Sequence, residues 1–326
     1  MLSSLLNSIF IILLGLSIGY LIQKIVISKK YHFSINIENT RKSLQKFTIL
    51  CIVPINYIGV YWTMDLSRKN LLIFPLLCLL QLILGGSIAI LMAKFNRLKP
   101  IDTGAYFCCG FFCNLGSIGG LICFIALGEQ GYQLAIFYIL FIQIIYYSLG
   151  FSIAKHYSLQ DDGKTRQLFD MKSILRDPFI IVGIFSIVIG FSLNISGLSR
   201  PDFYKNVIQV LVPLSTLILL ISIGLSMKFK KIRIYLKHAL YISGIKFVIV
   251  PLIMVSLGIL LGYHEINGGL PLKVLLIQSS TPVAFYALIP PSIYGLNLNL
   301  ANSCWAITTL GHIFLLPLIF ILINTI

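Results

Sequence analysis

Long apolar runs alternate with short polar segments along the whole chain. A helix needs about 20 apolar residues to cross the hydrocarbon core of a bilayer, and most of these runs have about that length. The pattern predicts ten membrane-spanning helices, over residues 5–24, 47–64, 70–93, 104–127, 132–154, 178–196, 206–226, 239–262, 272–293 and 300–323. The second and ninth runs are the weakest, because prolines interrupt both.

The composition is typical of a membrane protein. Hydrophobic residues make up 58% of it and charged residues 11%, whereas soluble domains carry about 25% charged residues. The fold class predicted is therefore an all-α polytopic membrane protein. The net charge of +15 does not indicate a nucleic-acid partner, because the basic residues stand in short loops between apolar runs, where membrane topology accounts for them.

The Lys and Arg residues are divided unevenly between the two sets of loops. If the N-terminus faces outside, nineteen of the 25 fall in inner loops, five fall in outer loops, and Lys246 lies within a span. Positive loops collect on the cytoplasmic side of membrane proteins. We therefore expect a multi-pass protein of the plasma (inner) membrane, surrounded by lipid, with both termini outside.

The most polar stretch divides the ten spans into two groups of five. We expect a first five-helix repeat over 1–154, a cytoplasmic linker over 155–176 and a second repeat over 177–326. An odd number of spans in each half gives the halves opposite topology, as in inverted-repeat transporters. A shift of 167 positions places Gly128 on Gly295 and Asn114 on Thr281, which supports the repeat weakly.

Spans four and nine are predicted to be broken helices that cross near the middle of the membrane. They contain "CNLGSIGGLICF" (113–124) and "SSTPVAFYALIPPSIYG" (279–295). Proline and glycine break or loosen helices, and unpaired backbone survives inside a membrane only where protein or a water-filled cavity surrounds it. The helix-breaking residues expected are Gly119, Gly120, Pro290 and Pro291. The alternative is that these glycines only pack closely and these prolines only end a helix.

Broken helices at matching positions in two repeats mark the binding site of many transporters, and their N-terminal ends attract anions. The substrate-binding residues expected are Asn114, Gly116, Ser117, Ser280, Thr281, Pro282 and Lys246. Lysines inside a span often mark a substrate pathway. Alternatively, Lys246 extends along its helix to the inner surface.

In these segments the chain resembles the auxin efflux carrier family, which includes plant auxin exporters and bacterial permeases for malate-like acids. The resemblance extends over most of the chain and includes the two interrupted stretches, "LRDPFIIVGIFSIVIGF", "VPLSTLILLISIGLSMKF", "KFVIVPLI" and "TLGHIFLLPL". The short central loop favours the bacterial permease type. Bile-acid-type sodium symporters share the architecture and are the nearest alternative.

The resemblance implies a scaffold of helices 1, 2, 6 and 7 and a moving transport core of helices 3–5 and 8–10, with broken crossover helices 4 and 9. It also implies an elevator-type displacement and a homodimer. The family's crossover positions fall on Asn114 and Pro282, while Thr281 stands where a second amide is expected.

Other chemistries find little support in the sequence. No HExxH motif is present, the five histidines are scattered, and no cysteine pair has zinc-ligand spacing with nearby histidines. We therefore expect no enzyme activity, no metal site and no cofactor. No carboxylate stands in the middle of a span, so sodium coupling is not expected.

The favoured function is secondary transport of a small organic anion, and the alternative is a solute-sensing receptor on a transporter fold. Substrate, direction and coupling ion stay open.

The predicted topology is open to a labelling test. A cysteine placed in the central linker by Gly163→Cys is expected to resist a membrane-impermeant thiol reagent in intact cells, because the charge bias puts this loop inside. Lys205→Cys, in a predicted outer loop, serves as the control and should react. Ready labelling of Gly163→Cys in sealed cells would refute this orientation.

Overall fold

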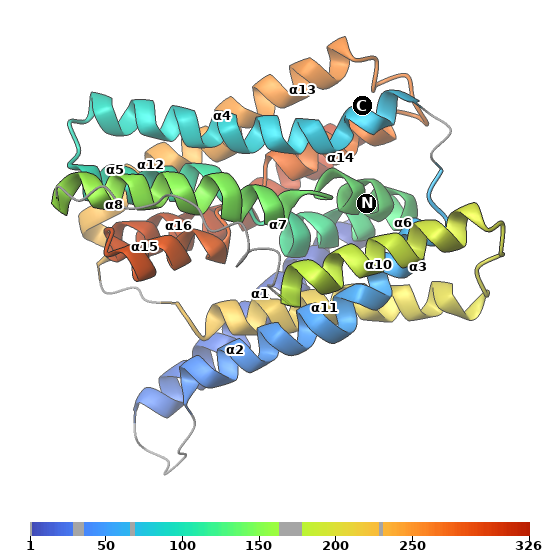
Figure 1. Ribbon diagram of the computed structural model, residues 1–326, viewed down its shortest axis with the longest axis horizontal. Helices are drawn as coiled ribbons and strands as arrows, with labels where there is room; N and C mark the ends of the chain where they lie inside the picture. Colours follow the sequence, from blue (N-terminus) through green and yellow to red (C-terminus); the bar gives the residue numbers. More distant parts are fainter. Residues whose placement is uncertain (1, 29–35, 66–68, 163–177, 228–230) are drawn as a thin grey trace. The chain divides into compact units, whose positions relative to one another are not determined.

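The computed structural model describes residues 2–28, 36–65, 69–162, 178–227 and 231–326 (Figure 1). Within these ranges the secondary structure consists of helices, the turns between them and one isolated antiparallel bridge. Most of the predicted linker over 155–176 lies outside the described residues.

The described residues contain seven helices that are long and apolar enough to cross a membrane. They span Leu2–Ile27, Ile37–Trp62, Leu71–Phe95, Leu115–Gln160, Phe203–Gly224, Ile232–Leu260 and Leu298–Thr325, and two shorter apolar helices span Ile180–Ile195 and Leu270–Ser279. The chain is thus an all-α polytopic membrane protein. The predicted runs 104–127 and 272–293 do not appear as continuous helices, because both are interrupted.

The chain forms two compact units, and each draws on both halves of the sequence. Unit 1 contains residues 1–68, 116–136 and 175–227, and unit 2 contains 69–115, 137–174 and 228–326. These units are not the predicted repeats, which would each be continuous in sequence. The repeat relation between 1–154 and 177–326 stays a prediction.

Unit 1 is built from two pairs of packed helices, α1 with α11 and α3 with α10 (Figure 1). Its elements are α1 (Leu2–Ile27), α2 (Ile37–Phe47), the π-helical turn η1 (Thr48–Ile52), α3 (Val53–Trp62), the π-helical turn η3 (Leu115–Gly119), most of α6 (Gly120–Tyr138), α10 (Pro178–Ile195) and α11 (Phe203–Gly224).

Glycines allow α1 and α11 to approach each other closely. A Cβ on Gly19 would lie 2.9 Å from the Cα of Gly224, and a Cβ on Gly224 would lie 3.0 Å from the Cα of Gly19. The hydrophobic effect does not drive helices together inside a membrane, so association depends on close packing, which small residues allow. This contact therefore determines how near the two helices come.

One ion pair ties three segments of unit 1 together. Arg200, which follows α10, pairs with Glu129 of α6 and also donates a hydrogen bond of 3.0 Å to the carbonyl oxygen of Gly59 in α3. Both charged side chains are mostly buried. The guanidinium group thus has a carboxylate and a main-chain acceptor, as a partly buried charge requires.

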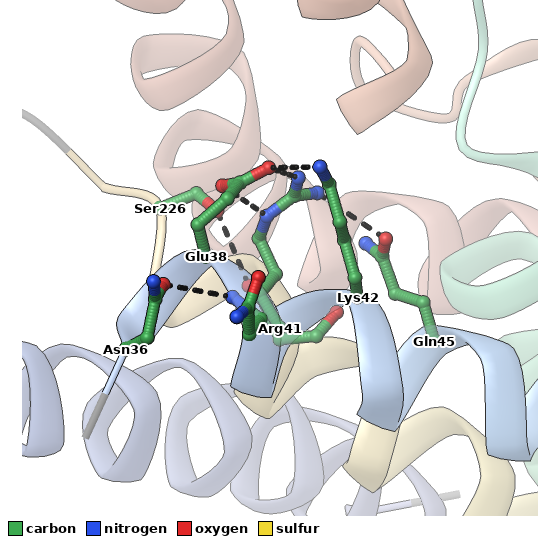
Figure 2. A network of polar contacts seen from close by, with 8 residues as sticks. Asn36, Glu38, Arg41, Lys42, Gln45 and Ser226 are labelled. Carbon is green, nitrogen blue, oxygen red and sulfur yellow. Dashed lines mark hydrogen bonds and ion pairs between the residues drawn. The ribbon is translucent and has the colours of Figure 1, made fainter.

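The helix α2 carries a ladder of polar contacts along its own surface (Figure 2). Asn36 caps its start by accepting from the backbone N–H of Asn39 at 3.1 Å. Glu38 pairs with Arg41 at 2.6 Å and with Lys42 at 3.3 Å. Contacts three and four residues apart stabilise helices locally. This helix has no buried residue, so local contacts matter more for it than for its neighbours.

Unit 2 holds the remaining helices, and its closest packing is of α4 on α5 and of α12 on α16. Its elements are the 3₁₀ turn η2 (Lys69–Ile73), α4 (Phe74–Phe95), α5 (Pro100–Phe111), α7 (Ile142–Ile145), the π-helical turn η4 (Tyr146–Phe151), α8 (Ser152–Asp162), α12 (Ile232–Gly244), the π-helical turn η5 (Ile245–Ile249), α13 (Val250–Leu260), α14 (Leu270–Ser279), the 3₁₀ turn η6 (Phe285–Leu288), α15 (Ile289–Tyr294) and α16 (Leu298–Thr325).

The α1–α11 contact gives a stability prediction. Gly19→Ala is expected to lower the free energy of unfolding by about 1–3 kcal/mol, because the added methyl group would overlap the backbone of α11. Gly183→Ala in α10 is the matched control, since a Cβ there meets nothing within 4 Å. Thermal unfolding of the purified variants in detergent measures both. Equal unfolding temperatures for the two variants would contradict the close approach.

Candidate functional site

Two helices of unit 2 break and pair with each other through their main chains. The helix α5 ends at Phe111 and α14 ends at Ser279. Beyond these ends, Cys113 and Val283 form an isolated antiparallel bridge. The backbone N–H of Asn114 donates to the carbonyl oxygen of Pro282 at 2.9 Å, and that of Ala284 donates to Phe112 at 3.1 Å. We call residues 112–114 and 280–284 the crossover.

Side chains donate hydrogen bonds to a main-chain carbonyl group near the end of α14. The hydroxyl of Thr281 donates to the carbonyl oxygen of Gln278 at 2.9 Å, and the amide of Gln81 donates to the same oxygen at 3.1 Å. The backbone N–H of Val283 donates to the hydroxyl of Thr308 at 3.2 Å. Groups left over at a helix end need such partners when they are buried.

A tyrosine holds the other strand of the crossover. The hydroxyl of Tyr146 accepts from the backbone N–H of Cys113 at 3.0 Å and donates to the carbonyl oxygen of the same residue at 2.7 Å. A second tyrosine, Tyr138, donates to the side-chain oxygen of Gln81 at 2.5 Å. Both tyrosines are buried. The crossover is therefore held rigidly from several elements of unit 2.

Lys246 points at this crossover from the π-helical turn η5. Its side chain is buried, and its ammonium nitrogen lies 2.6 Å from the carbonyl oxygen of Gly110 and 2.8 Å from the sulfur of Cys113. The ammonium group thus lies at the end of α5. This position contradicts the sequence-based alternative in which the side chain extends along its helix to the inner surface.

The structure brings part of the predicted site together. Asn114 and Pro282 share a hydrogen bond, and Thr281 lies beside Pro282 at the end of α14. Ser280 and Asn114 are both buried. Gly116 and Ser117 follow directly in the chain but belong to η3 in unit 1. The part of the predicted set that meets in one unit is therefore Asn114, Ser280, Thr281, Pro282 and Lys246.

The four residues predicted to break the helices stand elsewhere. Gly119 ends η3 and Gly120 begins α6, so both lie in helical backbone after the break. Pro290 and Pro291 lie in the first turn of α15, where the missing N–H of a proline is not needed. The breaks after α5 and α14 fall at 112–114 and 280–284, and a helix-breaking role for these four residues stays a prediction.

Sequence reasoning missed several residues that hold the crossover. Tyr146, Tyr138 and Cys113 stand in apolar runs, where tyrosines and cysteines are common and carry no motif. Gln81 is an amide inside a predicted span, and the sequence does not show its partner. No spacing in the sequence connects these residues to the break, because their contacts join positions 32 or more apart.

A stripe of polar groups on α16 has no hydrogen-bond partner among the described residues. It comprises the ring nitrogens of His312, the hydroxyl of Thr309 and the indole nitrogen of Trp305, and the side-chain amide of Gln278 in α14 is in the same state. Residues 305, 309 and 312 follow the spacing of one helix face. Buried polar groups usually find partners, so this stripe is hydrogen-bonding capacity that the described residues leave unused.

Comparison with known proteins gives transport-related names at low identity. No family model matches the chain. A protein of Methanothermobacter thermautotrophicus, named an uncharacterized transporter, is 23% identical over 282 residues, which are 86% of this chain and 88% of that protein. A protein of Methanocaldococcus jannaschii with the same description is 26% identical over 308 residues, 92% of this chain and 93% of its own.

Proposed function

We propose that this chain is a secondary transporter of small organic anions such as carboxylates, with the crossover of unit 2 at its substrate site. The observation that carries the proposal is the pairing of two broken apolar helices through Asn114 and Pro282. Irregular backbone inside a membrane is costly and marks transporter binding sites. The two archaeal relatives are named transporters and match nearly the whole chain, which favours transport over a receptor or an enzyme.

The charges at the crossover favour an anion. Lys246 supplies a positive charge next to Cys113, and the carboxylate that lies inside α6, Glu129, is paired with Arg200. The chain re-enters helical structure at Leu115, directly after Asn114, and the start of a helix carries partial positive charge. The amide of Asn114 offers both donors and acceptors to a carboxylate.

The polar stripe on α16 supplies further hydrogen-bonding capacity. A hydroxy acid or dicarboxylate carries several acceptors and donors, and His312, Thr309 and Gln278 have groups without partners among the described residues. Such groups are costly unless a ligand or water meets them. Their presence in the same unit as the crossover supports a polar solute over a purely apolar one.

We further propose the architecture of the auxin efflux carrier family, with ten spans in two inverted repeats. Gly128 and Gly295, the pair related by a shift of 167 positions, both have a φ of 71°, but ψ is −163° at Gly128 and 20° at Gly295, so their conformations support the repeat only weakly. The division into units also supports a scaffold and a transport core: unit 1 contains predicted spans 1, 2, 6 and 7, and unit 2 contains spans 3, 8, 9 and 10 and most of span 5. Span four is shared, since 116–136 belongs to unit 1. An elevator-type displacement in a homodimer completes this proposal.

The decisive experiment compares solute flux in three variants reconstituted into proteoliposomes. Asn114→Ala and Thr281→Val are expected to reduce uptake of labelled malate-like acids by about 10- to 100-fold, because each removes a buried hydrogen-bonding group worth about 1–3 kcal/mol. Gln143→Leu is the control. Gln143 lies in α7, outside the crossover and outside the polar stripe on α16, so flux should change little.

Uptake and binding measured on the parent protein distinguish the anion transporter from the symporter and the receptor. Saturable uptake that other small carboxylates inhibit supports the anion transporter, and uptake that requires sodium supports a bile-acid-type symporter instead. Binding without flux supports the solute-sensing receptor. If Asn114→Ala and Thr281→Val transport like the parent, the substrate site lies elsewhere.

A further inference from the structure

The ammonium group of Lys246 occupies a place that the break in α5 creates. In an uninterrupted helix the N–H of Asn114 would donate to the carbonyl oxygen of Gly110, four residues earlier. Here that N–H donates to Pro282 instead, so the carbonyl of Gly110 loses its helical partner. Lys246 donates to this oxygen at 2.6 Å.

Two more acceptors complete the surroundings of the ammonium group. Its nitrogen lies 2.8 Å from the sulfur of Cys113 and 3.4 Å from the carbonyl oxygen of Phe112. The thiol of Cys113 donates to the carbonyl oxygen of Phe111 at 3.6 Å, and its sulfur accepts from the amide of Gln81 at 3.6 Å as well as from the lysine. All three acceptors lie at the carboxyl end of α5.

This environment has the character of a cation site. The last carbonyl groups of a helix carry partial negative charge and attract cations. The ion pairs found among the described residues do not include Lys246, and 1% of the residue is exposed. A buried cation surrounded by main-chain oxygens resembles the way unwound helices hold dissolved ions, except that this cation is attached to the chain.

We propose that Lys246 is a tethered cation that fills a monovalent-cation site at the end of α5 and stabilises the crossover without a dissolved ion. An ammonium group has three donors, and the three acceptors use all of them. Lys246 is thus a positioning residue whose charge reaches a substrate without direct contact, in place of the direct contact expected from the sequence. The proposal does not depend on transport, because it concerns how the break in α5 is stabilised.

The test removes the tethered cation and supplies a free one. Lys246→Ala deletes the side chain beyond Cβ, which corresponds to a propylammonium ion. The purified variant is expected to melt roughly 5–10 °C below the parent in detergent. Propylammonium chloride should restore much of that loss, whereas tetramethylammonium chloride at equal ionic strength, which has no N–H donor, should not. The parent protein should respond equally to both salts.

A second pair of variants keeps the test valid if the alanine variant cannot be purified. Lys246→Met preserves most of the volume but removes the charge and the donors, and it should melt clearly below the parent and ignore propylammonium. Lys237→Met, from the first turns of the same apolar segment, is the control and should melt like the parent. The proposal is overturned if Lys246→Met is as stable as the parent, or if both salts stabilise Lys246→Ala equally.

Discussion

Two main-chain hydrogen bonds, from Asn114 to Pro282 and from Ala284 to Phe112, determine the structure of unit 2. Inside a membrane a broken helix exposes N–H and C=O groups that water cannot reach. The two breaks meet this requirement together, because each supplies a donor to the other. Neither interruption would be tolerable alone, so the second broken segment is a condition for the first.

The groups that this pairing does not satisfy explain the polar residues around it. The carbonyl oxygen of Gly110 loses its helical donor and accepts a hydrogen bond from Lys246 instead. The carbonyl oxygen of Gln278 accepts from the side chains of Thr281 and Gln81. Close packing contributes at the same point: a Cβ on Gly85 of α4 would collide with the carbonyl oxygen of Gly110. The backbone of α4 therefore lies directly against the end of α5, and a glycine is needed there for steric reasons.

The apolar pattern is sufficient to predict an all-helical membrane protein and to locate both interrupted segments within several residues. It is not sufficient to identify the interrupting residues. Pro290 and Pro291 carry the local signal of a break, yet a proline in the first turn of a helix has the same signature. The actual breaks are decided by partners more than 160 positions apart, which no local propensity records. Likewise, a lysine within a span is visible in the sequence, but the carbonyl group to which it donates is not.

The central claim is that residues 112–114 and 280–284 pair and that this pairing forms the transport site. Cys113 and Val283 face each other as a pair without mutual main-chain hydrogen bonds, where Cα atoms lie about 4.5 Å apart, a distance that suits a disulfide. The most direct measurement is peptide mapping and flux for Val283→Cys under mild oxidation, with Cys113→Ser added as the control. The account predicts a disulfide between positions 113 and 283 and a loss of flux that reduction reverses. Failure to form that disulfide would contradict the pairing, and a disulfide that leaves flux unchanged would contradict its role in transport.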